Sequence, residues 1–171
     1  IQMTDDERYM LRALELASLG MGCTAPNPMV GAVLVHEGRI IGEGYHHRSG
    51  MPHAEVMAVA SVQERDLLPQ STLYVTLEPC SHYGKTPPCA ELIIRERIPR
   101  VVVATQDPFP QVSGRGIQLL RDAGIEVIVG VLEGEARRLN APFITTQTKH
   151  RPFVSLKWAQ SLDGFIDRLR E

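Results

Sequence analysis

The hydrophobic residues near the start of the chain recur at two different spacings. Thr4 and Glu7 form a capping box, and a stretch with apolar residues at helical spacing follows it until Gly20: Met10, Ala13, Leu14 and Ala17. This stretch predicts an amphipathic helix. Residues 30–35 and 39–45 are instead apolar and rich in β-forming residues, and they flank Glu37-Gly38. That arrangement predicts a β-hairpin with a short loop.

The rest of the chain alternates between short apolar runs and helical stretches. Buried strands are predicted over residues 72–77, 100–105 and 126–131, and a last strand over residues 153–158 after a polar hinge. Helices are expected to begin at His53 and at Cys89, and to cover residues 113–123 and 133–140. Such alternation favours parallel strands with helices on both faces. The sequence therefore predicts an α/β fold with a mixed sheet and an antiparallel hairpin at its edge.

Composition narrows the class of protein. A chain of 171 residues with 43% hydrophobic residues suits one domain with a sizeable core, and we find no apolar run long enough to span a membrane. The net charge is −2 without a basic block, so we expect neither a nucleic-acid nor a membrane partner. Three cysteines do not form a disulfide framework, and they favour a reducing cytoplasm.

Candidate chemistry is concentrated in His53-Ala54-Glu55, Pro79-Cys80 and Cys89. One imidazole and two thiolates suit Zn²⁺ and leave a fourth tetrahedral position open, where a carboxylate such as that of Glu55 could move protons. The order of these residues follows the pattern of zinc nucleobase deaminases. It departs from that pattern because eight residues, rather than two, separate Cys80 from Cys89.

The long segment between the two cysteines carries a cation, Lys85, beside a hydroxyl, Thr86. This pairing would suit a phosphate on a substrate; the alternative is a solvated surface lysine. Arg115, near a predicted helix start, is a second candidate for an anion contact. Its alternative is a structural ion pair.

Two further stretches offer polar groups for recognition. Asn27 lies between Pro26 and Pro28 in a segment that the prolines stiffen, and its amide could bind the edge of a heterocycle. An Asn in an ordinary turn is the alternative. His46 and His47 stand shortly before His53, which favours a role in the site for one of them over a purely solvated loop.

A non-catalytic reading of the same residues is a zinc ion that only stabilises the fold. Structural zinc sites close with four protein ligands, and the fourth could be His82 or Cys23. Within the enzyme class, deamination of cytosine or guanine is the other alternative, which Lys85 and the long loop disfavour.

The chain resembles the deaminase domain of the bifunctional riboflavin-biosynthesis deaminase/reductase. The segments that carry the resemblance are residues 26–31, 53–55, 78–82 and 85–89. The resemblance implies a three-layer αβα, cytidine deaminase-like fold and a zinc-dependent deaminase domain over residues 3–148. Residues 149–171 are similar to the linker and the truncated start of the reductase domain. No reductase activity is therefore expected of this chain, and NADPH would serve only the missing domain.

The resemblance also implies an activity and a set of residues. The reaction would be hydrolytic deamination of 2,5-diamino-6-(5-phosphoribosylamino)pyrimidin-4-one to 5-amino-6-(5-phosphoribosylamino)uracil, by a cytoplasmic homo-oligomer. His53, Cys80 and Cys89 would hold Zn²⁺ and Glu55 would move protons. The substrate would meet Asn27, His46, Lys85, Thr86 and Asp107. Phe109 stands where related sequences often have Asn, which leaves a contact there open.

Overall fold

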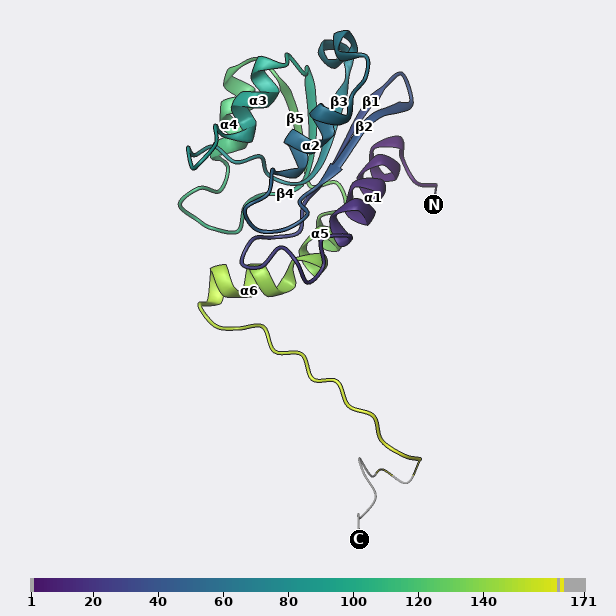
Figure 1. The fold of residues 1–171 in the computed structure, drawn as a ribbon, viewed down its shortest axis with the longest axis vertical. Helices are drawn as coiled ribbons and strands as arrows, with labels where there is room; N and C mark the ends of the chain where they lie inside the picture. The colour runs from purple at the N-terminus through teal and green to yellow at the C-terminus, as the bar shows by residue number, and fades with distance from the viewer. Residues whose placement is uncertain (1, 163, 165–171) are drawn as a thin grey trace.

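A five-stranded mixed sheet forms the centre of the molecule in the computed structural model, which describes residues 2–162 and residue 164 (Figure 1). The strand order is β2-β1-β3-β4-β5. The strands are β1 (Gly31–His36), β2 (Arg39–Tyr45), β3 (Thr72–Leu77), β4 (Arg100–Thr105) and β5 (Glu126–Val129). β1 runs antiparallel to β2 and to β3, whereas β3, β4 and β5 are parallel. The prediction of a mixed sheet with a hairpin at its edge is confirmed.

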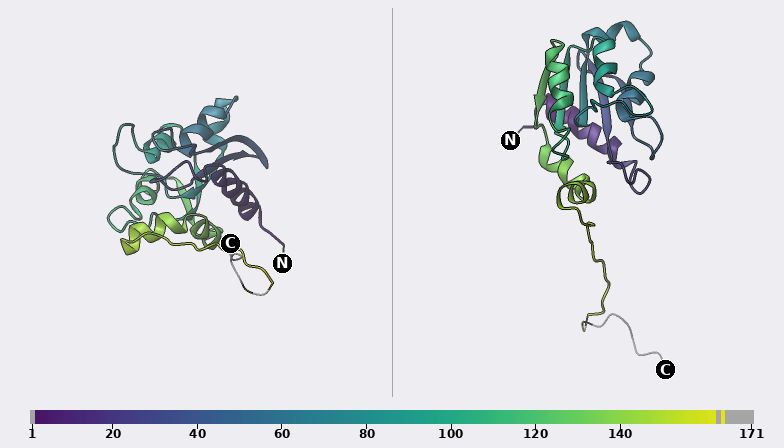
Figure 2. Two further views of the ribbon diagram at one scale, coloured as in Figure 1. Left: turned by 60° about the horizontal axis from the view of Figure 1, so that its bottom comes forward. Right: turned by 90° about the vertical axis from the view of Figure 1, so that its left-hand side faces the viewer.

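Helices cover both faces of this sheet (Figure 2). On one face, apolar residues of the sheet pack against α2 (Ala54–Ser61), α3 (Cys89–Arg95) and α4 (Arg115–Asp122). On the other face they pack against α1 (Asp5–Ser18) and α5 (Glu133–Leu139). A short 3-10 helix, η1 (Arg65–Gln70), precedes β3, and α6 (Ala141–Lys149) follows α5. The three-layer αβα architecture is therefore confirmed.

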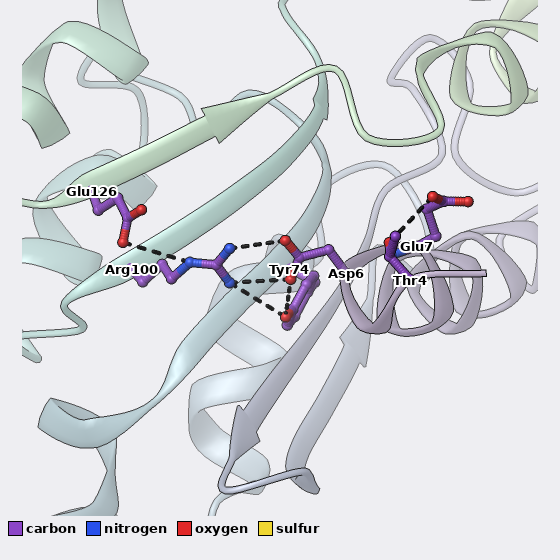
Figure 3. Close-up of polar contacts among 6 residues, drawn as sticks. All are labelled: Thr4, Asp6, Glu7, Tyr74, Arg100 and Glu126. Carbon is purple, nitrogen blue, oxygen red and sulfur yellow. Dashed lines mark hydrogen bonds and ion pairs between the residues drawn. The ribbon is translucent and has the colours of Figure 1, made fainter. Parts of the chain in front are cut away.

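The first turn of α1 is tied to the middle of the sheet by charged and polar contacts (Figure 3). The Thr4 side chain caps the helix by accepting a hydrogen bond from the Glu7 amide at 3.2 Å. The Asp6 carboxylate accepts hydrogen bonds from Arg100 of β4 at 2.8 and 3.1 Å, and from the Tyr74 hydroxyl of β3 at 2.6 Å. These contacts fix the helix over the sheet, with Met10 and Ala13 buried beneath it.

Four expectations differ from the structure. Helix α4 begins at Arg115, two residues later than predicted. β5 ends at Val129, two residues early, because Gly130 turns the chain with a φ of 103°. Helix α6 is an element that the sequence pattern did not predict. The strand predicted over residues 153–158 is wrong for the described chain: these residues run away from the body without strand pairing (Figure 1). A strand needs a neighbour for its backbone hydrogen bonds, and the described residues provide none there.

Part of the predicted reductase segment, residues 163 and 165–171, lies outside the described residues. Within the described part of the chain, every helix is too short or too polar to cross a membrane.

Candidate active site

Three separate elements bring His53, Cys80 and Cys89 together. His53 is the N-cap residue of α2, Cys80 lies just beyond the end of β3, and Cys89 is the first residue of α3. The Nδ1 atom of His53 lies 3.7 Å from Sγ of Cys80 and 3.4 Å from Sγ of Cys89. All three ligand atoms lie within 4.8 Å of one another. The spacing of eight residues is therefore compatible with a single cluster, because the intervening loop returns the chain to the site.

The geometry of this cluster fits a zinc ion. Two ligands bound tetrahedrally at the usual Zn–N and Zn–S distances lie about 3.6 Å apart, and both nitrogen–sulfur separations are close to this value. One imidazole and two thiol groups are also the donor types that zinc prefers. Among the residues that the structure describes, the cluster contains no fourth His, Cys, Asp or Glu. That composition matches the three-ligand arrangement of catalytic sites rather than the four-ligand arrangement of structural ones.

The surroundings of Cys80 favour its thiolate form. The Cys89 thiol, and then the His53 ring and the backbone N–H of Cys89, lower the pKa of Cys80 to about 4. The Cys89 N–H donates to Cys80 Sγ at 3.2 Å from the start of α3. The hydrogen bond to Cys80 and burial raise the pKa of Cys89, and the hydrogen bond to Cys80 also raises the pKa of His53. The Cys80 sulfur is therefore suited to hold a metal ion, and the Cys89 thiol would have to release its proton to do the same.

Glu55 lies in the first turn of α2, two residues from His53, and its side chain is only 4% exposed. Burial, together with the negative charge of Cys80, raises the pKa of Glu55 to about 7. The carboxyl group lines the same cavity as His53 and Cys80 but lies outside the three-ligand cluster. It is thus placed to exchange protons near neutral pH without binding the metal.

The active-site cavity has a volume of about 230 Å³ and opens beside the cluster. It collects six residues that the sequence analysis assigned to metal, proton or substrate: Asn27, His46, His53, Glu55, Cys80 and, from the loop after β4, Asp107. Three other predicted contacts do not line it: Lys85, Thr86 and Arg115 are exposed. Cys89 is buried and does not line the cavity, but its Sγ belongs to the three-residue cluster.

Asn27 and His46 form a connected pair at one side of the cavity. His46 is 3% exposed, and its Nδ1 lies 3.1 Å from the carbonyl oxygen of Pro52. A carbonyl oxygen only accepts, so Nδ1 carries the proton and Nε2 accepts from the Asn27 amide nitrogen at 3.3 Å. This leaves Oδ1 of Asn27 as the group that can accept a hydrogen bond from a bound molecule. Of the two adjacent histidines, His47 stacks on Tyr45 and is exposed, so His46 is the one that belongs to the site.

Sequence reasoning missed Glu78 and Phe143 as lining residues. It considered His82 only as a fourth zinc ligand; His82 lines the cavity but is not in the three-residue cluster. Glu78 is 6% exposed and accepts two hydrogen bonds from the Gly114 amide, at 2.8 and 3.0 Å, which joins the end of β3 to the start of α4. Its position directly before Pro79-Cys80 was the available signal. For Phe143 the signal was Pro142, a residue typical of a first helical turn.

A family model for the cytidine and deoxycytidylate deaminase zinc-binding region matches residues 3–105, a span that contains His53, Glu55, Cys80 and Cys89. The chain belongs to this family. Membership agrees with the cluster geometry and confirms the resemblance drawn from the sequence.

Relatives within this deaminase family share most of the chain. The riboflavin biosynthesis protein RibD of Aquifex aeolicus is 58% identical over 164 residues, which are 96% of this chain and 46% of that protein. A solved diaminohydroxyphosphoribosylaminopyrimidine deaminase/5-amino-6-(5-phosphoribosylamino)uracil reductase from Thermotoga maritima is 51% identical, with a TM-score of 0.88 over 98% of this chain and 50% of that one. Acinetobacter baumannii RibD is 47% identical, with a TM-score of 0.87 over 93% of this chain and 44% of that one. The chain thus spans about half the length of the relatives it matches.

Proposed function

We propose that this chain catalyses the hydrolytic deamination of 2,5-diamino-6-(5-phosphoribosylamino)pyrimidin-4-one to 5-amino-6-(5-phosphoribosylamino)uracil, a step of riboflavin biosynthesis. The observation that carries the proposal is a three-ligand cluster of His53, Cys80 and Cys89 with the buried carboxyl group of Glu55 in the adjoining cavity. The name of the similar Thermotoga maritima protein supports the choice of substrate.

The residues of the cluster would hold Zn²⁺. A zinc ion bound there would supply Lewis acidity and lower the pKa of a water molecule in the site. Glu55 accepts a proton from the water as its oxygen bonds to the ring carbon that carries the exocyclic amine. The same carboxyl group delivers that proton to the ring nitrogen. It then takes the remaining proton of the added hydroxyl group and passes it to the exocyclic amine. The C–N bond breaks as the carbonyl forms, so that one water is consumed and one ammonia is released.

The proposed substrate contacts fall into two groups: residues that line the cavity and exposed residues outside it. Asn27 and His46 line the cavity and would contact the base or the ribose, and Asp107, in the loop after β4, lines the same cavity. Lys85 and Thr86 lie on the exposed loop between the cysteines, and Arg115 begins α4; we assign these three to the phosphate region of the substrate. Phe109 packs in the Asp107 loop, where its amide donates to Asp107 Oδ1 at 2.8 Å, and it supplies no polar side-chain contact.

We also infer that the chain contains two parts. We assign residues 3–148 to the deaminase domain and residues 149–171 to the linker and the beginning of a reductase domain, for which NADPH would be the cofactor. The working protein would be a cytoplasmic homo-oligomer.

Ammonia release from the purified, zinc-loaded chain tests this function. The phosphorylated pyrimidine is compared with cytidine, cytosine and guanine, and metal analysis gives the zinc content of the same sample. We expect about one zinc per chain and turnover of the phosphorylated pyrimidine in preference to the others. Preference for cytosine or guanine would reassign the substrate, and a full zinc content with no ammonia from any of them would point to a structural metal site.

A further inference from the structure

The outer wall of the active-site cavity is formed in part by α6, a helix beyond residues 3–105 of the family match. Phe143 of this helix lines the active-site cavity together with Asn27 and Pro28. Two of these residues, Phe143 and Asn27, also line a second cavity of about 370 Å³ between α6 and residues 21–29. The phenyl ring is therefore part of the partition between the two spaces.

Asn140, three residues before Phe143, is 5% exposed at the start of α6. Its Oδ1 accepts a hydrogen bond from the Met29 amide at 2.8 Å, and its Nδ2 donates to the Met29 carbonyl oxygen at 2.7 Å. One side chain thus satisfies both backbone groups of a residue 111 positions away in the sequence. Met29 lies two residues after Asn27, so this clasp holds α6 and the Asn27 segment against each other.

Helix α6 is only partly buried. It contains no fully buried residue, and its Phe143 side chain is half-buried. A helix of nine residues that buries so little is marginal in isolation, because most helical stability in proteins comes from packing. The two hydrogen bonds of Asn140 therefore have a large share in deciding where the Phe143 ring lies.

We propose that Phe143 is a substrate-binding residue whose ring packs on the heterocycle of the bound pyrimidine, and that Asn140 is the positioning residue that places it. This inference rests on the proposed function and names a contact for the same cavity. An aromatic ring suits a planar heterocycle because each base presents a π-face, whatever its hydrogen-bonding edge. Asn27 and His46 would then recognise polar groups while Phe143 supplies apolar contact.

The test compares Phe143→Leu with Phe153→Leu in the full 171-residue, zinc-loaded chain. Phe153 is 46% exposed and lines neither cavity, so it provides the same substitution outside the site. Steady-state ammonia release gives KM and kcat. Calorimetry of the phosphorylated pyrimidine, in the background of Glu55→Gln, gives affinity without turnover. We expect Phe143→Leu to raise KM and Kd about 5- to 20-fold with kcat within about threefold, and Phe153→Leu to change neither.

Asn140 is tested by Asn140→Ala and by Asn140→Asp, which keeps the acceptor for the Met29 amide and loses the donor. The KM should rise in the order unmutated, Asp, Ala, with unchanged zinc content. In Asn140→Ala, hydrogen exchange of the Met29 amide should accelerate about tenfold or more relative to core amides of β3. That exchange measurement reports the clasp whether or not the chain turns over substrate.

An unmutated chain that is active while Phe143→Leu keeps its KM and Kd would overturn the inference and leave the proposed function intact. A fall in thermal stability or zinc content alone, without a change in Kd, would also overturn it, because a merely structural residue would behave in that way. If the unmutated chain neither releases ammonia nor binds the pyrimidine, the proposed function fails and the assignment of Phe143 fails with it. An unaltered Met29 exchange rate in Asn140→Ala would refute the positioning role.

Discussion

The proposed site residues differ in burial, and a buried side chain has its pKa and orientation set by its neighbours more than an exposed one does. Glu55 is enclosed by α2 and the cluster, and its environment alone raises its pKa to about 7. Lys85 stands on an exposed loop, and the structure gives it no partner within the cavity. The two residues therefore call for different experiments, one on turnover and one on substrate affinity.

Replacing Glu55 with Gln should abolish proton transfer and leave the metal in place. Gln has nearly the same shape but neither accepts nor returns a proton at neutral pH, and Glu55 lies outside the three-ligand cluster. We expect turnover to fall at least about 10²- to 10⁴-fold, with zinc content unchanged by metal analysis. The exposed Glu64, which faces Arg39 at 3.9 Å, gives the matched control Glu64→Gln. Near-normal activity of Glu55→Gln would remove Glu55 from the mechanism.

Replacing Lys85 with Ala should weaken binding of the phosphorylated substrate rather than slow its chemistry. An exposed ammonium group contributes modestly because solvent screens it, so we expect KM to rise about 3- to 10-fold at low salt with little change in kcat. Lys149→Ala, at the exposed end of α6, is the control. If the unmutated chain processes the dephosphorylated pyrimidine equally well, Lys85 has no phosphate to meet.

The metal ligands were predictable from the sequence because their residue types determine their chemistry. Imidazole and thiol groups in the order of His53, Cys80 and Cys89 indicate zinc wherever the chain brings them together. The role of Glu78 was not predictable in this way. It depends on the position of the Gly114 amide, 36 residues away, and only the packed structure supplies that position.

Among the elements, α2 must be placed most accurately, because it carries Glu55 and because His53 is its N-cap residue. It packs on β2 at Gly44, where an added Cβ would lie 2.6 Å from the carbonyl oxygen of Ala54 and would also meet the backbone nitrogen of Ala58. Backbone atoms cannot rotate out of the way as the end of a side chain can. The absence of a side chain at Gly44 thus sets the distance between the helix and the sheet.

Gly44→Ala should therefore displace α2 and disturb the site. We expect the free energy of unfolding to fall by about 1–3 kcal/mol and zinc to dissociate more readily, measured by chemical unfolding and by competition with a chelator. Gly84→Ala is the matched control, since an added Cβ at Gly84 meets nothing within 4 Å. Equal behaviour of the two variants would show that α2 tolerates the shift without cost to the site.

Elements with a strong hydrophobic pattern were predicted closely, and elements without one were not. β3 and β4 were predicted with the bounds that they have, because each is a short run of consecutive buried residues that are mostly apolar and β-branched. Helix α6 buries no residue completely, so its sequence carries little periodic signal. The segment 153–158 shows the opposite case, since its strand-like pattern is real but the described chain offers no neighbour for it.

For the molecule as a whole, the site lies where the parallel part of the sheet meets the loops that follow its strands. Cys80 and Asp107 follow the carboxyl ends of β3 and β4, the edge at which open α/β sheets bind ligands. The cluster combines residues 53, 80 and 89 from three separate elements, so its geometry depends on the assembled sheet and helices. Any change that destabilises the sheet or its helices should therefore also disturb the geometry of the site.

One contact that contributes to this assembly is the group of Asp6, Tyr74 and Arg100, which lies away from the site and links α1 to β3 and β4 (Figure 3). The hydrogen bonds from Arg100 hold the pKa of Asp6 below its usual value, and the Tyr74 hydroxyl adds to this effect. The Asp6–Arg100 pair is about a quarter exposed on each side. It is thus better protected from solvent than the surface pairs of α1.

Asp6→Asn should destabilise the protein in a pH-dependent way. Because the folded-state pKa of Asp6 is depressed, its contribution to stability is present above the unfolded pKa of about 3.9 and is lost as the pH falls through the folded value. We expect Asp6→Asn to lower the free energy of unfolding by about 1–3 kcal/mol at pH 7, with the difference shrinking toward zero below about pH 4. Urea unfolding across this range measures it.

The neighbouring residue provides the control for this last effect. Asp5 lies in the same helical turn and pairs with Arg8 at 2.9 Å, but both side chains are more than 60% exposed. Asp5→Asn therefore removes the same charge from the start of α1 and the same interaction with the helix dipole, and should cost about 0.5 kcal/mol. The amount by which Asp6→Asn lowers the free energy of unfolding more than Asp5→Asn does measures the link between α1 and the sheet. An equal loss for both variants would mean that the helix terminus, and not the contact with Arg100, accounts for the stabilisation.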